Sequence, residues 1–222
     1  MLHVLVEGPS DESLLRGLLP RLAPKHRFQI YPHQGKGKLP GNPNAAPDPK
    51  QRGLLDNLAA TLRAWGKSFR SETDRVVVLC DLDNDDCVGL LAKLKAMEAA
   101  IKKAPMCIFR LAIEETESWY LGDFDAISRA FPKAKKKHLK TWKPDSICGS
   151  WERFQLVVGA VSDEKVAWGE AMGRVLHVEE PLERRNLSPS FRKFCRRVRE
   201  HSGESGVVKP RRKKTPFFTA GR

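Results

Sequence analysis

The chain has 222 residues and carries 40 Lys and Arg against 27 Asp and Glu, which gives a formal net charge of +13 and an isoelectric point of about 9.7. This length fits one large domain, or a domain with an appendage, that buries enough surface to fold without disulfides or structural zinc. The five cysteines include no Cys-x-x-Cys pair and no apolar run approaches 18 residues, so we expect free thiols and a soluble, cytoplasmic protein with no signal peptide and no contact with a membrane.

The first 131 residues alternate between strand-like and helix-like segments. The expected order is strand 2–6, a helix capped by Ser10, strand 27–32, a helix over about 54–65, strand 75–80, helix 87–103 and strand 106–113. A loop rich in Gly and Pro separates the second strand from the second helix. This alternation predicts a three-layer α/β fold, with a Rossmann-like, mainly parallel sheet of about four strands flanked by helices.

The strand signals stop near residue 131. Residues 132–201 favour a helical extension packed on the α/β domain, with helices near 151–160, 163–176 and 189–201. Ser162 and Ser188 are expected to cap the last two, and Pro189 stands where a helix best tolerates proline. Residues 202–222 are strongly basic and are predicted to be a disordered tail.

Carboxylates follow three of the predicted strands. Glu7, Asp81 and Glu114 each end a strand, and the carboxyl ends of parallel strands meet at one edge of a sheet. In extended geometry Asp83 would project from the same face as Asp81. Carboxylates gathered in this way repel one another, and a hard divalent cation relieves the repulsion, which favours Mg²⁺ or Mn²⁺ over zinc.

The other acidic residues are less specific. The helix after Glu114 could turn Glu115 or Glu117 inward, and Glu117 is included among the candidate metal ligands. Four other acids stand near expected helix starts, where a negative charge stabilises the first turn. We interpret them as first-turn charges and not as ligands, and they are Asp11, Glu12, Asp85 and Asp86.

The positive charge favours a polyanionic partner, most simply nucleic acid. One candidate patch surrounds Trp142 and consists of Lys135, Lys136, Lys137, His138, Lys140 and Lys143; an aromatic side chain among cations suits stacking on unpaired bases. Lys36 and Lys38, in the Gly-rich loop, are candidates for contact with a backbone phosphate. A solvated basic surface is the alternative for both groups.

Two segments resemble the motifs of Toprim proteins. Residues 6–12 (Val-Glu-Gly-Pro-Ser-Asp-Glu) resemble the first motif, and residues 78–83 (Val-Leu-Cys-Asp-Leu-Asp) resemble the second, a strand that ends in Asp-x-Asp. The chain is more similar still to the Toprim-like family known as domain of unknown function 4276. The stretches that carry this resemblance are 33–38, 62–65, 81–87, 113–121 and 186–191, within about residues 1–200.

The resemblance implies a Toprim fold over residues 1–131, related to nucleases of the overcoming-lysogenization-defect type. It implies that Glu7 acts as general acid/base, that Asp81 and Asp83 hold a catalytic Mg²⁺ (or Mn²⁺), and that an acidic residue near 114–117 assists. Such proteins are often encoded beside an ABC- or SMC-like ATPase in bacterial phage-defence modules. We therefore expect a metal-dependent nuclease subunit with such a partner, acting on DNA or RNA, and a homo-oligomer is left open.

Three other functions compete with a Toprim nuclease. An EF-hand calcium loop from Asp81 needs Gly at its sixth position and Glu at its twelfth, where Asp86 and Ala92 stand. An aspartyl phosphatase of the haloacid dehalogenase type needs Thr or Val at position 85, and it leaves Glu7 without a role. A non-catalytic Toprim-like module that docks on an ATPase or on nucleic acid stays open, since likeness of fold does not establish activity.

Overall fold

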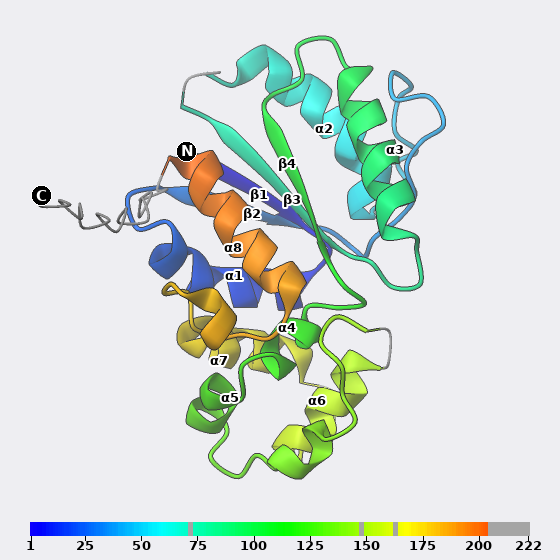
Figure 1. Ribbon diagram of the computed structural model, residues 1–222. Helices are drawn as coiled ribbons and strands as arrows, with labels where there is room; N and C mark the ends of the chain where they lie inside the picture. The colour runs from blue at the N-terminus through cyan, green and yellow to red at the C-terminus, as the bar shows by residue number, and fades with distance from the viewer. Residues whose placement is uncertain (71–72, 147–148, 162–163, 204–222) are drawn as a thin grey trace, which may run out of the picture.

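Four parallel strands form the centre of the molecule in the computed structural model, which describes residues 1–70, 73–146, 149–161 and 164–203. The strands are β1 (Leu2–Val6), β2 (Phe28–Pro32), β3 (Arg75–Asp81) and β4 (Cys107–Ala112), and their order in the sheet is β2-β1-β3-β4. Leu2 of β1 pairs with Phe28 on one side and with Arg75 on the other. All three pairings are parallel, so the carboxyl ends of the strands lie at one edge of the sheet (Figure 1).

Helices cover both faces of this sheet. On one face lie α1 (Pro9–Leu22) and α8 (Pro189–Ser202), and on the other lie α2 (Leu54–Ser68) and α3 (Cys87–Ala99). The strands alternate between the two apolar cores, as a period of two requires: Val77 and Leu79 point to the side of α1, and Val76 and Val78 to the side of α2. The predicted fold class, a parallel α/β sheet of four strands flanked by helices, is confirmed.

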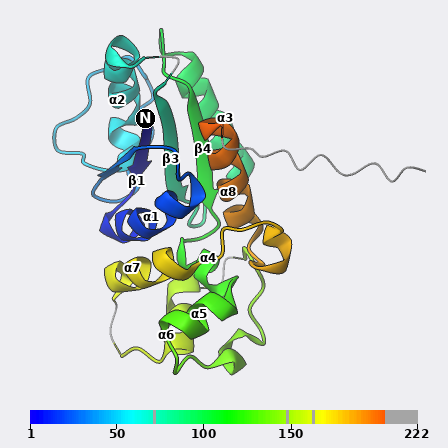
Figure 2. The ribbon, with the colours of Figure 1, turned by 90° about the vertical axis from the view of Figure 1, so that its left-hand side faces the viewer.

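A helical layer lies beneath α1, at the edge where the strands end (Figure 2). It contains α4 (Glu117–Leu121), α5 (Phe124–Ala130), α6 (Ser150–Val158) and α7 (Lys165–Val175), with 3-10 turns at Lys136–Leu139 and Leu182–Arg184. Glycines let α7 approach the backbone of α1 closely. A Cβ at Gly173 would lie 2.2 Å from the carbonyl oxygen of Leu14, and one at Gly169 would lie 2.6 Å from that of Ser10.

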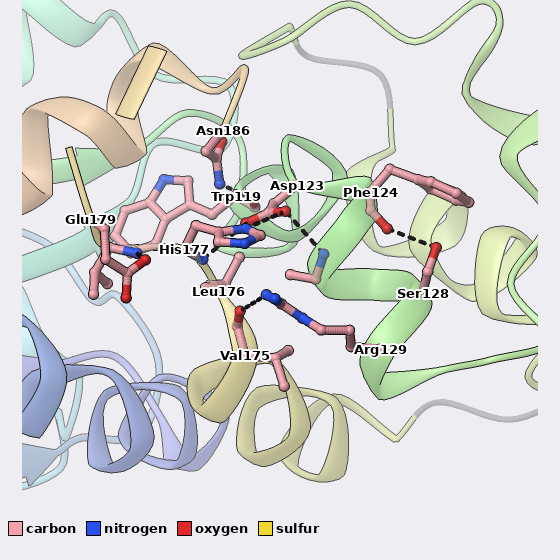
Figure 3. Close-up of polar contacts among 12 residues, drawn as sticks. Trp119, Asp123, Phe124, Ser128, Arg129, Val175, Leu176, His177, Glu179 and Asn186 are labelled. Atoms are coloured by element: carbon pink, nitrogen blue, oxygen red, sulfur yellow. Dashed lines mark hydrogen bonds and ion pairs between the residues drawn. The ribbon is translucent and has the colours of Figure 1, made fainter. Parts of the chain in front are cut away.

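A buried carboxylate ties this layer together (Figure 3). Asp123 caps α5 by accepting the backbone N–H of Ala126 at 3.0 Å, and it also accepts the backbone N–H and the ring Nδ1 of His177, each at 2.9 Å. Arg129 of α5 donates to the carbonyl oxygen of Val175 at 2.6 Å. These contacts join the α4–α5 turn to the segment after α7, so the layer is held by side chains as well as by apolar packing.

Several local predictions are corrected. Helix α1 begins at Pro9 with Gly8 at its N-cap, so Ser10 lies inside the first turn. Helix α7 has Glu164 at its N-cap, and Ser162 lies outside the described residues. The capping role of Ser188 is confirmed, since its hydroxyl accepts the N–H of Phe191 at 3.2 Å.

The C-terminal helix belongs to the core of the α/β layers. Helix α8 packs against the sheet, and its Phe191, Phe194 and Val198 join the same apolar cluster as β1 and α1. The proposed basic tail lies outside the described residues from position 204 onward. Cys80, Cys87, Cys107 and Cys195 are free thiols, as expected, while Cys148 is not described. No helix among the described residues is long and apolar enough to cross a membrane.

Candidate metal centre

Glu7 and Asp81 meet at the ends of two neighbouring strands. Glu7 follows β1, Asp81 is the last residue of β3, and the backbone N–H of Asp81 donates to Oε1 of Glu7 at 2.8 Å. Oδ1 of Asp81 is buried and has no hydrogen-bond partner among the described residues. A buried carboxylate oxygen without a partner costs free energy that the fold must offset elsewhere, so this oxygen is a candidate ligand atom.

Two further carboxylates are buried beside this pair. Asp11 of α1 is 4% exposed, and Glu117, the first residue of α4, is 2% exposed. Oδ1 of Asp11 accepts the hydroxyl of Thr116 at 3.2 Å, which joins the start of α1 to the turn before α4. The sequence interpretation of Glu117 as an acid that the helix could turn inward agrees with this placement. Asp11 lies in the first turn of α1, as predicted, but it is buried there beside the other carboxylates. Its spacing from Leu14, Leu15 and Leu18 places it on the buried stripe of α1, a signal that could have identified it.

The four carboxyl groups of Glu7, Asp11, Asp81 and Glu117, which we call the acidic centre, have raised pKa values. Burial raises the pKa of Glu7 to about 7, and the charges of Asp11 and Asp83 add to this shift. Burial raises the pKa of Asp11 to about 6 and that of Glu117 to about 7. The pKa of Asp81 is raised well above its usual value, first by burial and then by the charges of Asp11, Glu7 and Glu117.

Lys165, at the start of α7, places a positive charge beside the acidic centre. Its Nζ contacts Oε1 of Glu115 at 3.1 Å, and its pKa is raised because the charges of Glu117, Glu115 and Asp81 outweigh the effect of its own burial. The same ammonium lies 5.2 Å from the centroid of the Trp151 ring. Sequence reasoning missed Lys165, since nothing near position 165 links it to carboxylates about 50 residues away.

Asp83 does not share the environment of Asp81. Strand β3 ends at Asp81 and Asp83 has a φ of 50°, so the extended geometry that would place both side chains on one face is not found. The Asp83 side chain is 53% exposed and binds Nζ of Lys36 at 3.0 Å. Nζ of Lys36 also contacts Oδ2 of Asp85 at 2.7 Å and the carbonyl oxygen of Leu82 at 2.9 Å. Lys36, which the sequence indicated as a candidate for contact with phosphate, is therefore paired with the carboxylates of Asp83 and Asp85 in the loop after β3.

Glu114 faces a helix start and lies apart from the contact between Glu7 and Asp81. Its φ is 62°, and its carboxylate accepts the backbone N–H groups of Gly149 at 2.6 Å and Ser150 at 3.0 Å, together with the Ser150 hydroxyl. These groups form the N-terminus of α6, where a carboxylate is favoured. Both oxygens of Glu114 thus bind the start of α6, a structural role that its position two residues after β4 does not indicate.

The donor chemistry of the acidic centre fits a hard divalent cation. Its residues offer carboxylate oxygens, which Mg²⁺ and Mn²⁺ prefer, and Oδ1 of Asp81 is buried without a partner among the described residues. In the described part of the chain no three His, Cys, Asp or Glu side chains already lie in an arrangement that could hold an ion. Side-chain rotation is therefore needed to bring the carboxylates together around a cation.

The lysines of the predicted basic patch are exposed as expected, but the tryptophan among them is buried. Lys135, Lys136, Lys137 and Lys140 are exposed around the 3-10 turn Lys136–Leu139, and Nζ of Lys136 lies 5.3 Å from the centroid of the Phe124 ring. Trp142, in contrast, is 9% exposed and belongs to the apolar core. The proposed stacking of a base on Trp142 is therefore wrong, while nucleic-acid contact by these lysines stays a prediction.

Comparison with known proteins identifies a family. The sequence model of a family described as "Domain of unknown function (DUF4276)" matches residues 6–199, a span from β1 to α8 that contains the whole acidic centre and Lys165. No curated protein matches the chain, and no solved structure does.

Proposed function

Since the chain belongs to the DUF4276 family, whose description states no activity, we propose a function from the site itself: Toprim-like, divalent-metal-dependent hydrolysis of phosphodiesters in nucleic acid. The acidic centre formed by Glu7, Asp11, Asp81 and Glu117 would hold the cation. The net charge of +13 supports a polyanionic substrate. This proposal adds Asp11 to the metal-ligand set expected from sequence and removes Asp83 and Glu114 from it.

The observation that carries the proposal is the environment of Asp81. Its Oδ1 is buried without a partner among the described residues, while Glu7, Asp11 and Glu117 all act on its charge. A purely structural carboxylate in such a place would be expected to have a cationic or hydrogen-bonding partner for each buried oxygen. Carboxyl groups whose pKa values are strongly shifted by burial and by one another's charge cluster at functional sites.

The side chains of the acidic centre would have two roles, metal binding and proton transfer. A bound Mg²⁺ or Mn²⁺ would neutralise charge on the scissile phosphate and lower the pKa of a water molecule. Asp81, Asp11 and Glu117 would hold the ion from three different elements, namely β3, α1 and α4. By resemblance to Toprim proteins, Glu7 acts as general acid/base and accepts a proton from the attacking water. The backbone N–H of Asp81 donates to Oε1 of Glu7 at 2.8 Å, so Oε2 is the oxygen that would accept this proton. Lys165 adds a positive charge at the edge of the centre.

The biological setting of the proposal rests on the resemblance alone. Likeness to Toprim nucleases of the overcoming-lysogenization-defect type supports an ABC- or SMC-like ATPase as partner and a role in phage defence. Cleavage by the isolated chain and cleavage by the assembly are therefore both to be measured.

The test is cleavage of duplex DNA, single-stranded DNA, RNA and tRNA with Mg²⁺, with Mn²⁺ and with EDTA, in the presence and absence of an ABC- or SMC-like ATPase from the same organism. We expect metal-dependent cleavage by the wild type and by Asp125→Asn, an exposed carboxylate of α5 that serves as control. Asp81→Asn and Glu7→Gln should abolish it. Cleavage that survives Asp81→Asn would overturn the proposal, and no cleavage under any condition by folded protein would favour the non-catalytic module.

A further inference from the structure

A groove lies between the Gly-rich loop and α3, on the opposite side of the sheet from α1 and α8. Its volume is about 670 Å³ and it is lined by residues 36–41 and 43 of the loop and by residues of α2 and α3. Figure 1 shows this loop alongside α3. Buried side chains of Leu55, Leu90 and Met97 form much of the apolar lining. The volume and the apolar character are typical of sites for small molecules or for single residues of a larger ligand.

The loop wall of the groove is held in place by several hydrogen bonds. The backbone N–H of Leu55 donates to the carbonyl oxygen of Lys36 at 2.7 Å, and the backbone N–H of Lys38 donates to Oδ1 of Asp56 at 2.9 Å. Further along, Nη2 of Arg63 donates to the carbonyl oxygen of Ala45 at 2.8 Å. A wall anchored to α2 at three places forms the groove before any ligand arrives, which lowers the entropy cost of binding.

The charges at the groove favour an anionic ligand with an apolar part. Lys38 and Lys93 are exposed at its rim. Among the described residues that line it, Asp85 is the single acidic one, and Lys36 neutralises it at 2.7 Å. A nucleotide has this combination, since its base presents flat apolar faces and its phosphate carries negative charge.

The groove adjoins the acidic centre. The backbone N–H of Gly35, which precedes the groove-lining segment, donates to the carbonyl oxygen of Glu7 at 2.9 Å. Lys36 spans the two sites, because its Nζ lies on Asp83 and Asp85 and its charge also acts on Glu7. The loop segment that lines the groove therefore begins beside the strand end that carries Glu7.

We propose that this groove binds an unpaired nucleotide next to the phosphodiester at the acidic centre. The inference rests on the proposed function and narrows its substrate to nucleic acid with a single-stranded or unstacked nucleotide at that position. A base inside a duplex cannot enter the groove, because its faces and edges are already stacked and paired. DNA and RNA share the chemistry that the groove recognises, so both are tested.

The experiment measures binding of fluorescein-labelled oligothymidylate and oligouridylate, and of a matched duplex, in EDTA, where cleavage plays no part. Ala96→Trp fills the groove from an exposed position on α3, and Ala92→Trp places the same side chain on α3 outside the groove. Lys93→Glu reverses a charge at the rim, and Lys95→Glu makes the same change at an exposed position of α3 that does not line it. We expect Ala96→Trp and Lys93→Glu to weaken single-strand binding by about tenfold, with both controls close to wild type.

Equal effects of groove and control variants, absence of single-strand binding, or tighter binding of the duplex would each overturn the inference. The preferred sugar follows from the ratio of the two single-stranded affinities. Cleavage assays with the same variants distinguish a failure of the groove proposal from a failure of the proposed nuclease activity. Metal-dependent cleavage that Asp81→Asn abolishes but Ala96→Trp leaves unchanged would refute the groove alone. Groove-dependent binding without cleavage under any condition would refute the nuclease and leave the groove as a binding site.

Discussion

The backbone N–H of Asp81 donates to Oε1 of Glu7 at 2.8 Å, across 74 positions of sequence. The bond forms because β1 and β3 are adjacent and parallel, with Leu5 paired to Val78, so their carboxyl ends lie side by side. It holds the carboxyl group of Glu7 against the residue that carries the next carboxyl group of the acidic centre. The consequences of this arrangement for stability can be measured without knowing the substrate.

Replacement of Asp81 by Asn should stabilise the metal-free protein at about pH 8. The change removes a buried carboxyl group whose ionisation is opposed by burial and by the charges of Asp11, Glu7, Glu117 and Glu115, and we expect a gain of about 1 kcal/mol in the free energy of unfolding. Thermal unfolding in EDTA measures it. In saturating Mg²⁺ the wild type should instead gain about 2–3 kcal/mol at a concentration near 100 times the Kd, and the variant should not. A variant that is less stable in EDTA and still responds to Mg²⁺ would contradict the assignment.

The stability of the metal-free wild type should fall as the pH rises toward 7. Glu7 and Glu117 have folded-state pKa values of about 7, and Asp11 of about 6, all above their usual values. Between about pH 4.5 and 7 the folded state therefore binds more protons than the unfolded state, and this contribution to stability is full below that window and lost above it. Urea unfolding across this range in EDTA measures the slope.

The control for this slope is Glu117→Gln, which removes one of the titrating groups and should flatten the dependence. Glu152→Gln, at a more exposed position of α6, should leave it as in the wild type. A stability that rises through the same window would show that these carboxyl groups are ionised in the folded protein at low pH.

Removal of the Glu114 side chain should destabilise the fold without affecting metal binding. Glu114→Ala leaves the N–H groups of Gly149 and Ser150 at the start of α6 without their acceptor, and loss of such a cap costs about 1–2 kcal/mol. Chemical unfolding measures the loss, and the Mg²⁺-dependent rise in Tm should persist. If that rise disappears while the fold is retained, Glu114 is a ligand after all, as its place after β4 first indicated.

Alanine at Gly173 should weaken the contact between α7 and α1. Its Cβ would lie 2.2 Å from the carbonyl oxygen of Leu14, so the two helices must separate, and overpacking of this kind costs about 1–3 kcal/mol. Gly41→Ala, where a Cβ meets nothing within 4 Å, serves as control and should change stability by less than about 0.5 kcal/mol. Equal unfolding midpoints for the two variants would mean that the helices adjust without cost.

The sequence by itself determined the α/β class, the four strands and the pairing of Glu7 with Asp81. Strands buried on both faces appear as continuous apolar runs, and parallel strands must end at one edge, so residues that follow them are predictable neighbours. It also indicated Glu117, because the helix expected after Glu114 could turn this acid inward, and the structure buries it.

Only the tertiary structure decided the rest of the site. Lys165 reaches the carboxylates because α7 lies on α1, and Glu114 turns away because α6 begins beside it. Asp83 leaves the face of Asp81 because the chain turns at a φ of 50°. Local periodicity specifies which residues follow a strand. The direction of a carboxylate depends on the donors and charges that distant segments bring to it, and no local pattern records those.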